Sequence, residues 1–304
     1  MNKEKITIVG VARNVEHTIC EDFDLIIRAF ESFEIERMIV IESDSTDNTL
    51  VVLKELESKY KNLVFKSEGR LANRIPDRIE RIRYCRNLYV EEIRRLNLES
   101  KYVIVSDLDG INSRLKKRYV EECFIESDWD AVFPNQLFGY YDILALRQDF
   151  WVNHSCIEEL KWRQSFVYSK STRLNFIRSV SLFFQYDRAR KQAFYSKMLR
   201  INRNLPRIPV KSAFGGIGIY KSEIFTNFDY SPIENATHCE HVDLHLKMHN
   251  SGYRLFIQPG FINNYFNTYN INKVLFIRII RKLVWNNKLL YDLQKRIAKI
   301  LGVK

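Results

Sequence analysis

The chain has 304 residues, 46% of them hydrophobic and 13% aromatic, so it can bury a sizeable core and is not a disordered protein. Its 10 glycines and 6 prolines are too few for a collagenous or low-complexity architecture. The formal net charge of +11 predicts an anionic partner, for which nucleotide phosphates, acidic lipid headgroups and nucleic acid are the candidates.

Cysteine usage and the amino terminus indicate a cytoplasmic protein. The five cysteines are odd in number and include no C-x-x-C pair, which is typical of reduced thiols rather than of disulfides or a zinc cluster. The first residues lead into an apolar run that is too short for a signal peptide. The chain contains no uncharged run of about 18 apolar residues, so we expect no membrane-spanning helix.

The first 135 residues alternate between strand and helix patterns. Strands are predicted at residues 6–11, 37–42, 63–66 and 102–106, and helices at 18–33, 49–59 and 78–95. Strands separated by helices of this length predict an α/β fold with a mostly parallel sheet and helices on both faces. In such a sheet the ligand crevice lies beyond the carboxyl ends of the strands.

The composition changes at about residue 139. Fourteen Lys and Arg stand against four acids between residues 147 and 211, with aromatic residues interleaved, and we expect a helical insertion there. A strand at 212–220, a helix at 238–251 and a strand at 253–258 follow. The chain is therefore divided into segments at 1–138, 139–211, 212–268 and 269–304.

Two aspartates, Asp107 and Asp109, follow an apolar strand and precede Gly110. A turn at Gly110 can bring both carboxylates toward one ion, and Mg²⁺ or Mn²⁺ prefers such hard oxygen ligands together with diphosphate oxygens. A cation there would neutralise a departing nucleoside diphosphate. The alternative is a solvated loop, but the position at the end of a buried strand favours the metal.

Polar residues also follow the first two predicted strands. Arg13 and Asn14 end the first strand, and Glu42 and Asp44 end the second, where they can accept hydrogen bonds from a ribose or a base edge. The alternative is that residues 42–49 form only a strand-to-helix turn with a capping side chain.

The helix predicted at 78–95 carries several arginines. Arginine binds diphosphate through two parallel hydrogen bonds, and we select Arg86 with Asn87 for that role. We expect Arg78, Arg81 and Arg83 to form a solvated face, paired with nearby glutamates.

The helix predicted at 238–251 gathers carboxylates and histidines. Glu240 and Asp243 share one side of it, and His241, His245 and His249 form an adjacent stripe. Glu240 or Asp243 is a candidate general base for an acceptor hydroxyl, and His241 is a candidate metal ligand. Zinc bound by the histidines alone is the weaker hypothesis, because the chain has no H-E-x-x-H. The alternative is an amphipathic helix with capping acids.

From residue 273 onward the chain has nine Lys and Arg and one acid, interleaved with apolar residues. Such a basic amphipathic helix is typical of segments that lie on an anionic membrane, and it would place the protein on the inner face of the cytoplasmic membrane. The alternative is a helix packed on the domain with its basic face in water.

Six segments, taken in order, resemble bacterial and fungal glycosyltransferases of the GT-A fold, in particular those related to capsule-associated α-1,3-mannosyltransferases. They are ITIVGVARN, IESDSTDNT, RIRYCRN, VSDLD, FGGIGIY and CEHVDLHLKMHNSGYRLFIQPGFIN, and they cover about residues 5–135 and 210–265. The resemblance implies a UDP- or GDP-sugar donor with Glu42 and Asp44 near the nucleoside. It also places Mn²⁺ or Mg²⁺ at Asp107 and Asp109.

By the same resemblance, Glu240 or Asp243 lies near the acceptor as base and His241 near the metal. Many GT-A enzymes have an E-D pair where this chain has Glu240-His241, which leaves the base, and an inverting or retaining outcome, open. Residues 1–138 would bind the nucleotide-sugar and 212–268 the acceptor, a saccharide or lipid-linked saccharide for a surface polysaccharide. The aromatic and basic insertion would help to bind that acceptor.

Two rival functions remain. A nucleotidyltransferase usually has a glycine-rich loop after its first strand, where this chain reads VARN. A non-catalytic protein that binds membrane or nucleic acid is suggested by charge alone, but Asp107 and Asp109 would repel phosphates unless a cation intervenes. We therefore expect no nucleic-acid partner.

Overall fold

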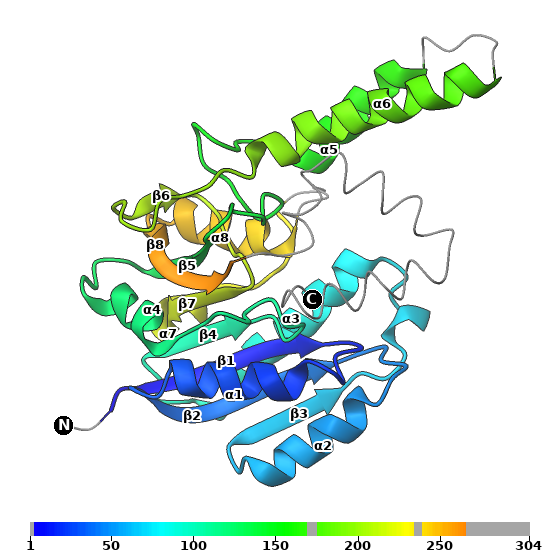
Figure 1. Ribbon diagram of the computed structural model, residues 1–304. Helices are drawn as coiled ribbons and strands as arrows, with labels where there is room; N and C mark the ends of the chain where they lie inside the picture. Colours follow the sequence, from blue (N-terminus) through cyan, green and yellow to red (C-terminus); the bar gives the residue numbers. More distant parts are fainter. Residues whose placement is uncertain (1–2, 169–174, 234–238, 266–304) are drawn as a thin grey trace.

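One eight-stranded sheet organises residues 3–168, 175–233 and 239–265, the part of the chain that the computed structural model describes (Figure 1). The strands are β1 (Lys5–Ala12), β2 (Glu34–Glu42), β3 (Leu63–Ser67), β4 (Tyr102–Ser106), β5 (Ala131–Gln136), β6 (Ile208–Val210), β7 (Ile217–Lys221) and β8 (Leu255–Asn264). Their order across the sheet is β3-β2-β1-β4-β7-β5-β8-β6. Strands β3, β2, β1 and β4 run parallel, β8 runs parallel to β5, and β7 and β6 are antiparallel to their neighbours.

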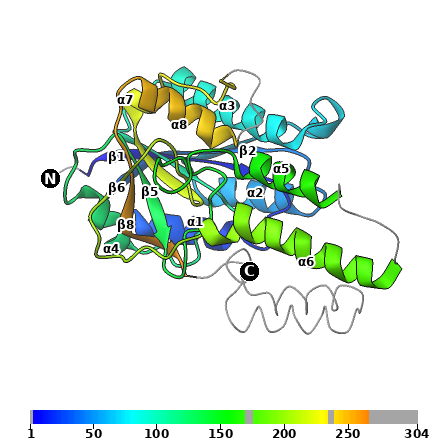
Figure 2. The ribbon, with the colours of Figure 1, turned by 90° about the horizontal axis from the view of Figure 1, so that it is seen from above.

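Helices cover both faces of this sheet, as the sequence predicts (Figures 1 and 2). They are α1 (Ile19–Ala29), α2 (Thr49–Lys59), α3 (Arg78–Leu96), α4 (Lys117–Glu121), α5 (Cys156–Tyr168), α6 (Asn175–Ala193), α7 (Ser222–Phe225) and α8 (Glu240–Asn250). Single 3₁₀ turns occur at Leu71–Asn73, Glu122–Phe124 and Tyr195–Lys197. The α/β class and the mostly parallel sheet are therefore confirmed.

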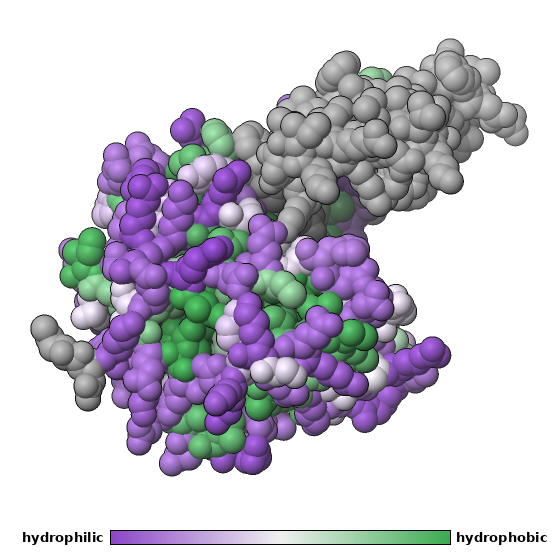
Figure 3. All heavy atoms as spheres, turned by 60° about the horizontal axis from the view of Figure 1, so that its bottom comes forward, coloured by the Kyte–Doolittle hydropathy of each residue, from purple (hydrophilic) through white to green (hydrophobic). Residues whose placement is uncertain are grey.

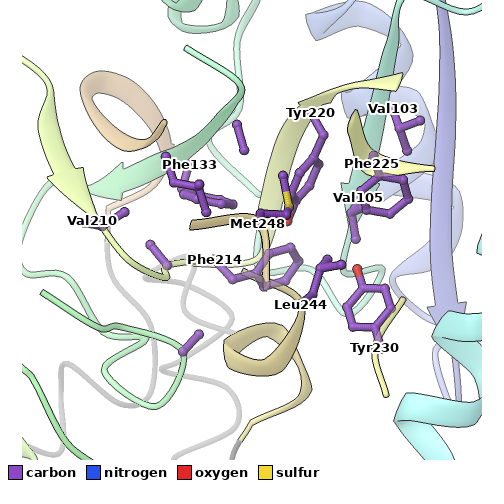
Figure 4. Close-up of a cluster of buried hydrophobic side chains, with 14 of the residues drawn as sticks. Val103, Val105, Phe133, Val210, Phe214, Tyr220, Phe225, Tyr230, Leu244 and Met248 are labelled. Carbon is purple, nitrogen blue, oxygen red and sulfur yellow. The ribbon is translucent and has the colours of Figure 1, made fainter. Parts of the chain in front are cut away.

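Alternate residues of the central strands build two separate cores, because successive strand side chains point to opposite faces. Val103 and Val105 of β4 pack with α3 and α8, whereas Tyr102 and Ile104 pack with α1, α2 and α4. The first core surrounds Leu244 and Met248 of α8 with aromatic and aliphatic side chains from the strands (Figure 4). This packing fixes α8 against the sheet.

Two strands depart from the sequence prediction. Strand β5 was not predicted because it contains Pro134, which cannot donate to a sheet ladder. The structure accommodates it at a register shift between Phe133 and Asn135, opposite a stretch of β8 that carries Pro259. Strand β8 was predicted to end near residue 258, but it continues through Gly260 to Asn264. A β-carbon at position 260 would lie 1.5 Å from Oε2 of Glu122, so any other residue there would require the Glu122 side chain to move.

The segment 139–211 is only partly helical. Helices α5 and α6 form a hairpin that projects from the body of the protein (Figures 1 and 2), while residues 139–155 and 198–207 form no helix. The segment also contributes the short strand β6, which the sequence pattern did not indicate.

The predicted basic tail, 269–304, lies outside the described residues, as does His238. All five cysteines are free thiols. Among the helices that the structure describes, none has both the length and the apolar character that a bilayer crossing requires. On the face at the bottom of Figure 1, hydrophilic residues predominate and hydrophobic residues emerge in smaller areas between them (Figure 3).

Candidate functional site

A cavity of about 450 Å³ opens beyond the carboxyl ends of β1, β2 and β4, where the parallel topology predicts a ligand crevice. Its walls come from these strand ends, from α3, from the start of α8 and from the segment that follows β5. The predicted site residues that line it are Arg13, Asp44, Arg86, Asp107, Asp109, Glu240 and His241. Residues from distant parts of the sequence therefore meet in one place.

The segment Asp107-Leu108-Asp109 leaves β4 with both carboxylates toward this cavity. The side chain of Leu108 is buried in the opposite core, so its two neighbours project to the same side. The backbone N–H of Asp107 donates to the carbonyl of Gly216 at 2.9 Å, which fastens the segment to the loop before β7. Gly110 adopts φ +83°, and its N–H donates to Oδ2 of buried Asp22 at 2.8 Å. The turn expected at Gly110 is present.

The two carboxylates are electrostatically strained without a cation. Burial is the largest cause that raises the pKa of Asp107, Arg86 opposes it, and the nearby charges of Asp109, Asp142 and Glu240 add to it, so that the pKa lies at about 7. Burial also raises the pKa of Asp109. A divalent cation would relieve this repulsion and favour the ionised forms of both.

Arg86 connects the aspartates of β4 to α8. Its Nη2 lies 3.2 Å from Oδ1 of Asp107, and its Nε lies 3.0 Å from Oε1 of Glu240. Its Nη1 donates to the hydroxyl of Tyr89 at 3.2 Å. All three guanidinium nitrogens therefore have protein partners, and Arg86 contacts two acidic side chains at once. The role of diphosphate ligand that its sequence position suggests stays a prediction.

The ring of His241 is packed tightly, but its nitrogens make no hydrogen bond. Its ring stacks on Phe214 with centroids 3.6 Å apart, it has 2% of its surface exposed, and both ring nitrogens are buried without a hydrogen-bond partner. Burial, followed by the charge of Arg86, keeps its pKa well below the usual value, so the ring is neutral. A neutral imidazole with unsatisfied nitrogens at a cavity wall is a suitable metal ligand.

The donor set therefore fits a divalent cation only in part. Two carboxylates and an unsatisfied imidazole are of the right kind, but the described ranges contain no group of three His, Cys, Asp or Glu side chains arranged to hold a metal. Asp107 and Asp109 would hold the ion together with ligand oxygens, and His241 is the candidate third protein ligand.

Arginines line the outer part of the cavity. The side chains of Arg13 and Arg78 make no ion pair or hydrogen bond within the described part of the chain, so they remain available to an anionic ligand. Arg81 pairs with Asp44, with Nε 3.3 Å from Oδ2, and also donates to the carbonyls that precede α3. Arg78 is exposed, as expected for a solvated face, and also lines the cavity, whereas Arg81 is partly buried and pairs with Asp44 rather than with a nearby glutamate.

Four predicted site residues lie outside the cavity lining and have structural partners. Glu42 accepts from the N–H of Ser45 at 2.9 Å, and Asn14 accepts from the N–H of Thr46 at 2.7 Å. Asn87 accepts from the N–H of Tyr230 at 2.7 Å. The first two contacts hold the loop that follows β2 in place, and the third holds Tyr230 against α3.

The fourth is Asp243, whose Oδ2 lies 2.7 Å from Nη1 of Arg83, and the pair is buried. Arg83 is therefore not part of a solvated face. The structure separates Asp243 from the cavity and leaves Glu240 as the acid of α8 that lines it.

Sequence reasoning missed Tyr141 and Asp142, which follow β5 and line the cavity. Oδ2 of Asp142 accepts from the N–H of Gly215 at 2.9 Å, and burial raises the pKa of its carboxyl. The available signal was an acid directly after the aromatic pair at 140–141, within a segment otherwise poor in acids. Because β5 itself was not predicted, that acid had no strand end to identify it.

Three of the solved structures that resemble this one show the extent of the similarity. S. aureus TarS 1-349 has 14% sequence identity and a TM-score of 0.43 over 83% of this chain. The mannosyltransferase PcManGT from Pyrobaculum calidifontis, in complex with GDP-Man and Mn²⁺, has 13% identity and a TM-score of 0.42 over 87% of this chain. The glucosyl-3-phosphoglycerate synthase from Mycobacterium tuberculosis, in complex with Mn²⁺, uridine-diphosphate and phosphoglyceric acid, has 13% identity and a TM-score of 0.39 over 86% of this chain. The chain spans 57% of the first two proteins and 67% of the third. No family model matches the chain, and no curated protein does.

Proposed function

We propose that this protein is a metal-dependent glycosyltransferase that moves a sugar from a UDP- or GDP-sugar to a saccharide or lipid-linked saccharide in surface polysaccharide biosynthesis. The observation that carries the proposal is the meeting of Asp107 and Asp109 with Glu240 in one cavity at the strand ends. The outer part of this cavity adds the unpaired cations Arg13 and Arg78. A polyanionic donor and a polar acceptor can both find partners there.

Each residue has a role in this proposal. A bound Mn²⁺ or Mg²⁺ would supply positive charge to the departing nucleoside diphosphate. Asp107 and Asp109 would hold the ion, and Arg13 and Arg78 would bind diphosphate oxygens.

Glu240 would accept the proton of the acceptor hydroxyl. It is 7% exposed, begins α8, and its Oε1 is held 3.0 Å from Nε of Arg86, so its carboxylate has a fixed direction. Asp142 is the second acid at this wall and the alternative base.

The test is incubation of the purified protein with a panel of sugar nucleotides and Mn²⁺, while release of nucleoside diphosphate is measured. We expect release from one UDP- or GDP-sugar, faster with a saccharide acceptor, and none in the presence of a chelator. Release of pyrophosphate from a nucleoside triphosphate and a sugar phosphate would instead identify a nucleotidyltransferase. Binding of sugar nucleotides that is equally tight in chelator would contradict the metal-dependent mechanism.

A further inference from the structure

The α5–α6 hairpin exposes aromatic side chains along its length. Trp162, Phe166 and Phe184 have 58%, 56% and 51% of their surface exposed. A single exposed aromatic residue is ordinary, but three on one projecting hairpin indicate an interaction surface. The hairpin extends away from the sheet in both views (Figures 1 and 2), so a partner can approach it without meeting the body first.

On α5 the aromatic residues share one face with a cation. The exposed positions of this helix, Glu158, Lys161, Trp162, Ser165 and Phe166, recur at the spacing of a single helical face. The rings of Trp162 and Phe166 pack edge to face with centroids 5.0 Å apart, so they form one apolar unit rather than two isolated side chains.

On α6 the same combination occurs. Phe184, Arg188 and Lys191 are exposed at helical spacing, whereas Ala189 and Ala193 are buried. Between residues 184 and 193 of α6, the exposed positions thus include one aromatic ring and several cations, and the two buried positions are alanines.

The charge of the hairpin is strongly positive. Residues 156–193 contain eight Lys and Arg and three Asp and Glu. One of these acids, Glu159, is bound by Lys197, Arg163 and His154, and these hydrogen bonds hold its pKa at about 2 against the effect of burial. Over the residues that the structure describes, Lys161, Arg188 and Lys191 form no ion pair.

The base of the hairpin is braced. Arg163 of α5 donates from Nη1 to Oε1 of Gln192 of α6 at 2.8 Å, and its guanidinium lies over the ring of Trp162. In an antiparallel pair this contact places Phe184 about two turns farther from the body than Gln192. The aromatic side chains are therefore distributed along a stiff arm.

We propose that the α5–α6 hairpin is a membrane-docking arm that inserts Trp162, Phe166 and Phe184 into the interface of an anionic bilayer. Lys161, Arg188 and Lys191 then contact the lipid phosphates. Aromatic rings prefer the headgroup level of a bilayer, and each cation near an anionic surface adds to the attraction. A second copy of this chain is the less suitable occupant, because two strongly positive hairpins repel each other. The arm does not depend on the proposed reaction, and its residues are not those of the basic tail predicted from the sequence at 269–304.

The experiment measures co-sedimentation of the full chain with vesicles of phosphatidylcholine, with and without phosphatidylglycerol, and needs no substrate. We expect wild-type protein to bind the anionic vesicles. The triple variant W162S/F166S/F184S should bind them at least about tenfold more weakly, since a factor of ten corresponds to less than the burial of one large side chain. The variant K161Q/R188Q/K191Q should show a smaller preference for phosphatidylglycerol than wild type.

The matched control is I125S/V51S, which removes two apolar side chains that are 79% and 54% exposed on the body and should leave vesicle binding unchanged. Far-ultraviolet circular dichroism confirms that each variant is folded. If W162S/F166S/F184S and K161Q/R188Q/K191Q both bind anionic vesicles as tightly as the wild-type protein does, the proposal is overturned and the membrane contact belongs to another part of the chain. A second outcome would overturn the proposal in favour of self-association. In it, the wild-type protein does not bind vesicles and is a dimer in sedimentation equilibrium, whereas W162S/F166S/F184S is a monomer.

Discussion

Arg83 and Asp243 form a buried ion pair, in which Nη1 of the arginine lies 2.7 Å from Oδ2 of the aspartate. The other oxygen, Oδ1, accepts from the N–H of Ile233 at 3.2 Å. The pair therefore joins α3, α8 and the segment between α7 and α8. An acid committed in this way contributes to folding rather than to proton transfer.

We predict that Asp243→Asn lowers the free energy of unfolding by about 3–5 kcal/mol, because it removes the buried counter-charge of Arg83 and leaves only Glu80, whose side chain is half exposed, as its acidic partner. Chemical denaturation measures this directly. Arg95→Gln is the matched control: it removes an ion pair with Glu92 in which the arginine is 66% exposed, and it should change stability by less than about 1 kcal/mol. A small effect of Asp243→Asn would contradict the structural role.

Glu240→Gln, in contrast to Asp243→Asn, should lower activity and leave the stability of the fold nearly unchanged. We predict that kcat falls by about 10²–10⁴-fold, the usual contribution of a general base, while donor affinity stays within a few-fold of wild type. The amide keeps the acceptor oxygen for Nε of Arg86, so the fold should be retained. Single-turnover kinetics and calorimetry separate the two quantities. Loss of donor affinity with unchanged kcat would assign Glu240 to donor binding, and the same experiment on Asp142→Asn tests the alternative base.

Much of the site could be predicted because topology alone positions it. Parallel strands bring their carboxyl ends to one edge of the sheet, so Arg13, Asp44 and Asp107 had to lie near one another wherever the loops went. The spacing of Asp107 and Asp109 around an apolar residue likewise fixed their common direction, since Leu108 is drawn into the core.

The other residues could not be assigned because tertiary partners decide their roles. Arg78 and Arg83 are five positions apart on α3, yet one lines the cavity and the other is buried against Asp243. Nothing local in the sequence distinguishes a free arginine from one that meets a carboxylate 160 residues away. Asp142 was missed for a related reason, because the bulge that tolerates Pro134 in β5 exists only once β8 is beside it.

The raised pKa of Asp107 predicts that metal affinity depends on pH. In the metal-free protein this carboxyl titrates at about 7, above its ordinary value, so below pH 7 a cation must displace a proton in order to bind. We predict that the affinity for Mn²⁺ falls by about tenfold for each pH unit below 7 and levels off above it. Titration calorimetry of the protein alone, over a series of buffers, measures this.

The control for pH dependence is Asp107→Asn, which should bind Mn²⁺ more weakly and lose the break near pH 7. Asp47→Asn removes an acid that lies outside the cavity lining and should keep both the affinity and the break. An affinity for Mn²⁺ that is constant between about pH 5 and 8 would contradict the assignment of Asp107 as a ligand.

Gly216 provides a test of how the metal-binding segment is held. It adopts φ +97°, its carbonyl accepts from the N–H of Asp107 at 2.9 Å, and a β-carbon there would lie 2.6 Å from Cγ2 of Ile111. Gly252, which follows α8, adopts φ +89°, and a β-carbon added to Gly252 would have no other atom within 4 Å. The two glycines share the backbone strain that alanine would meet, but only Gly216 adds a steric clash beside the aspartates.

We predict that Gly252→Ala costs about 1–2 kcal/mol of unfolding free energy, from the left-handed conformation alone, and leaves Mn²⁺ affinity unchanged. Gly216→Ala should cost about 1–3 kcal/mol more, because the clash adds an overpacking penalty. It should also weaken Mn²⁺ binding, since relief of the clash moves the carbonyl that fixes Asp107. Chemical denaturation and calorimetry on both variants separate these effects. Equal stability losses, or equal Mn²⁺ affinities, would show that the loop before β7 does not position the carboxylates.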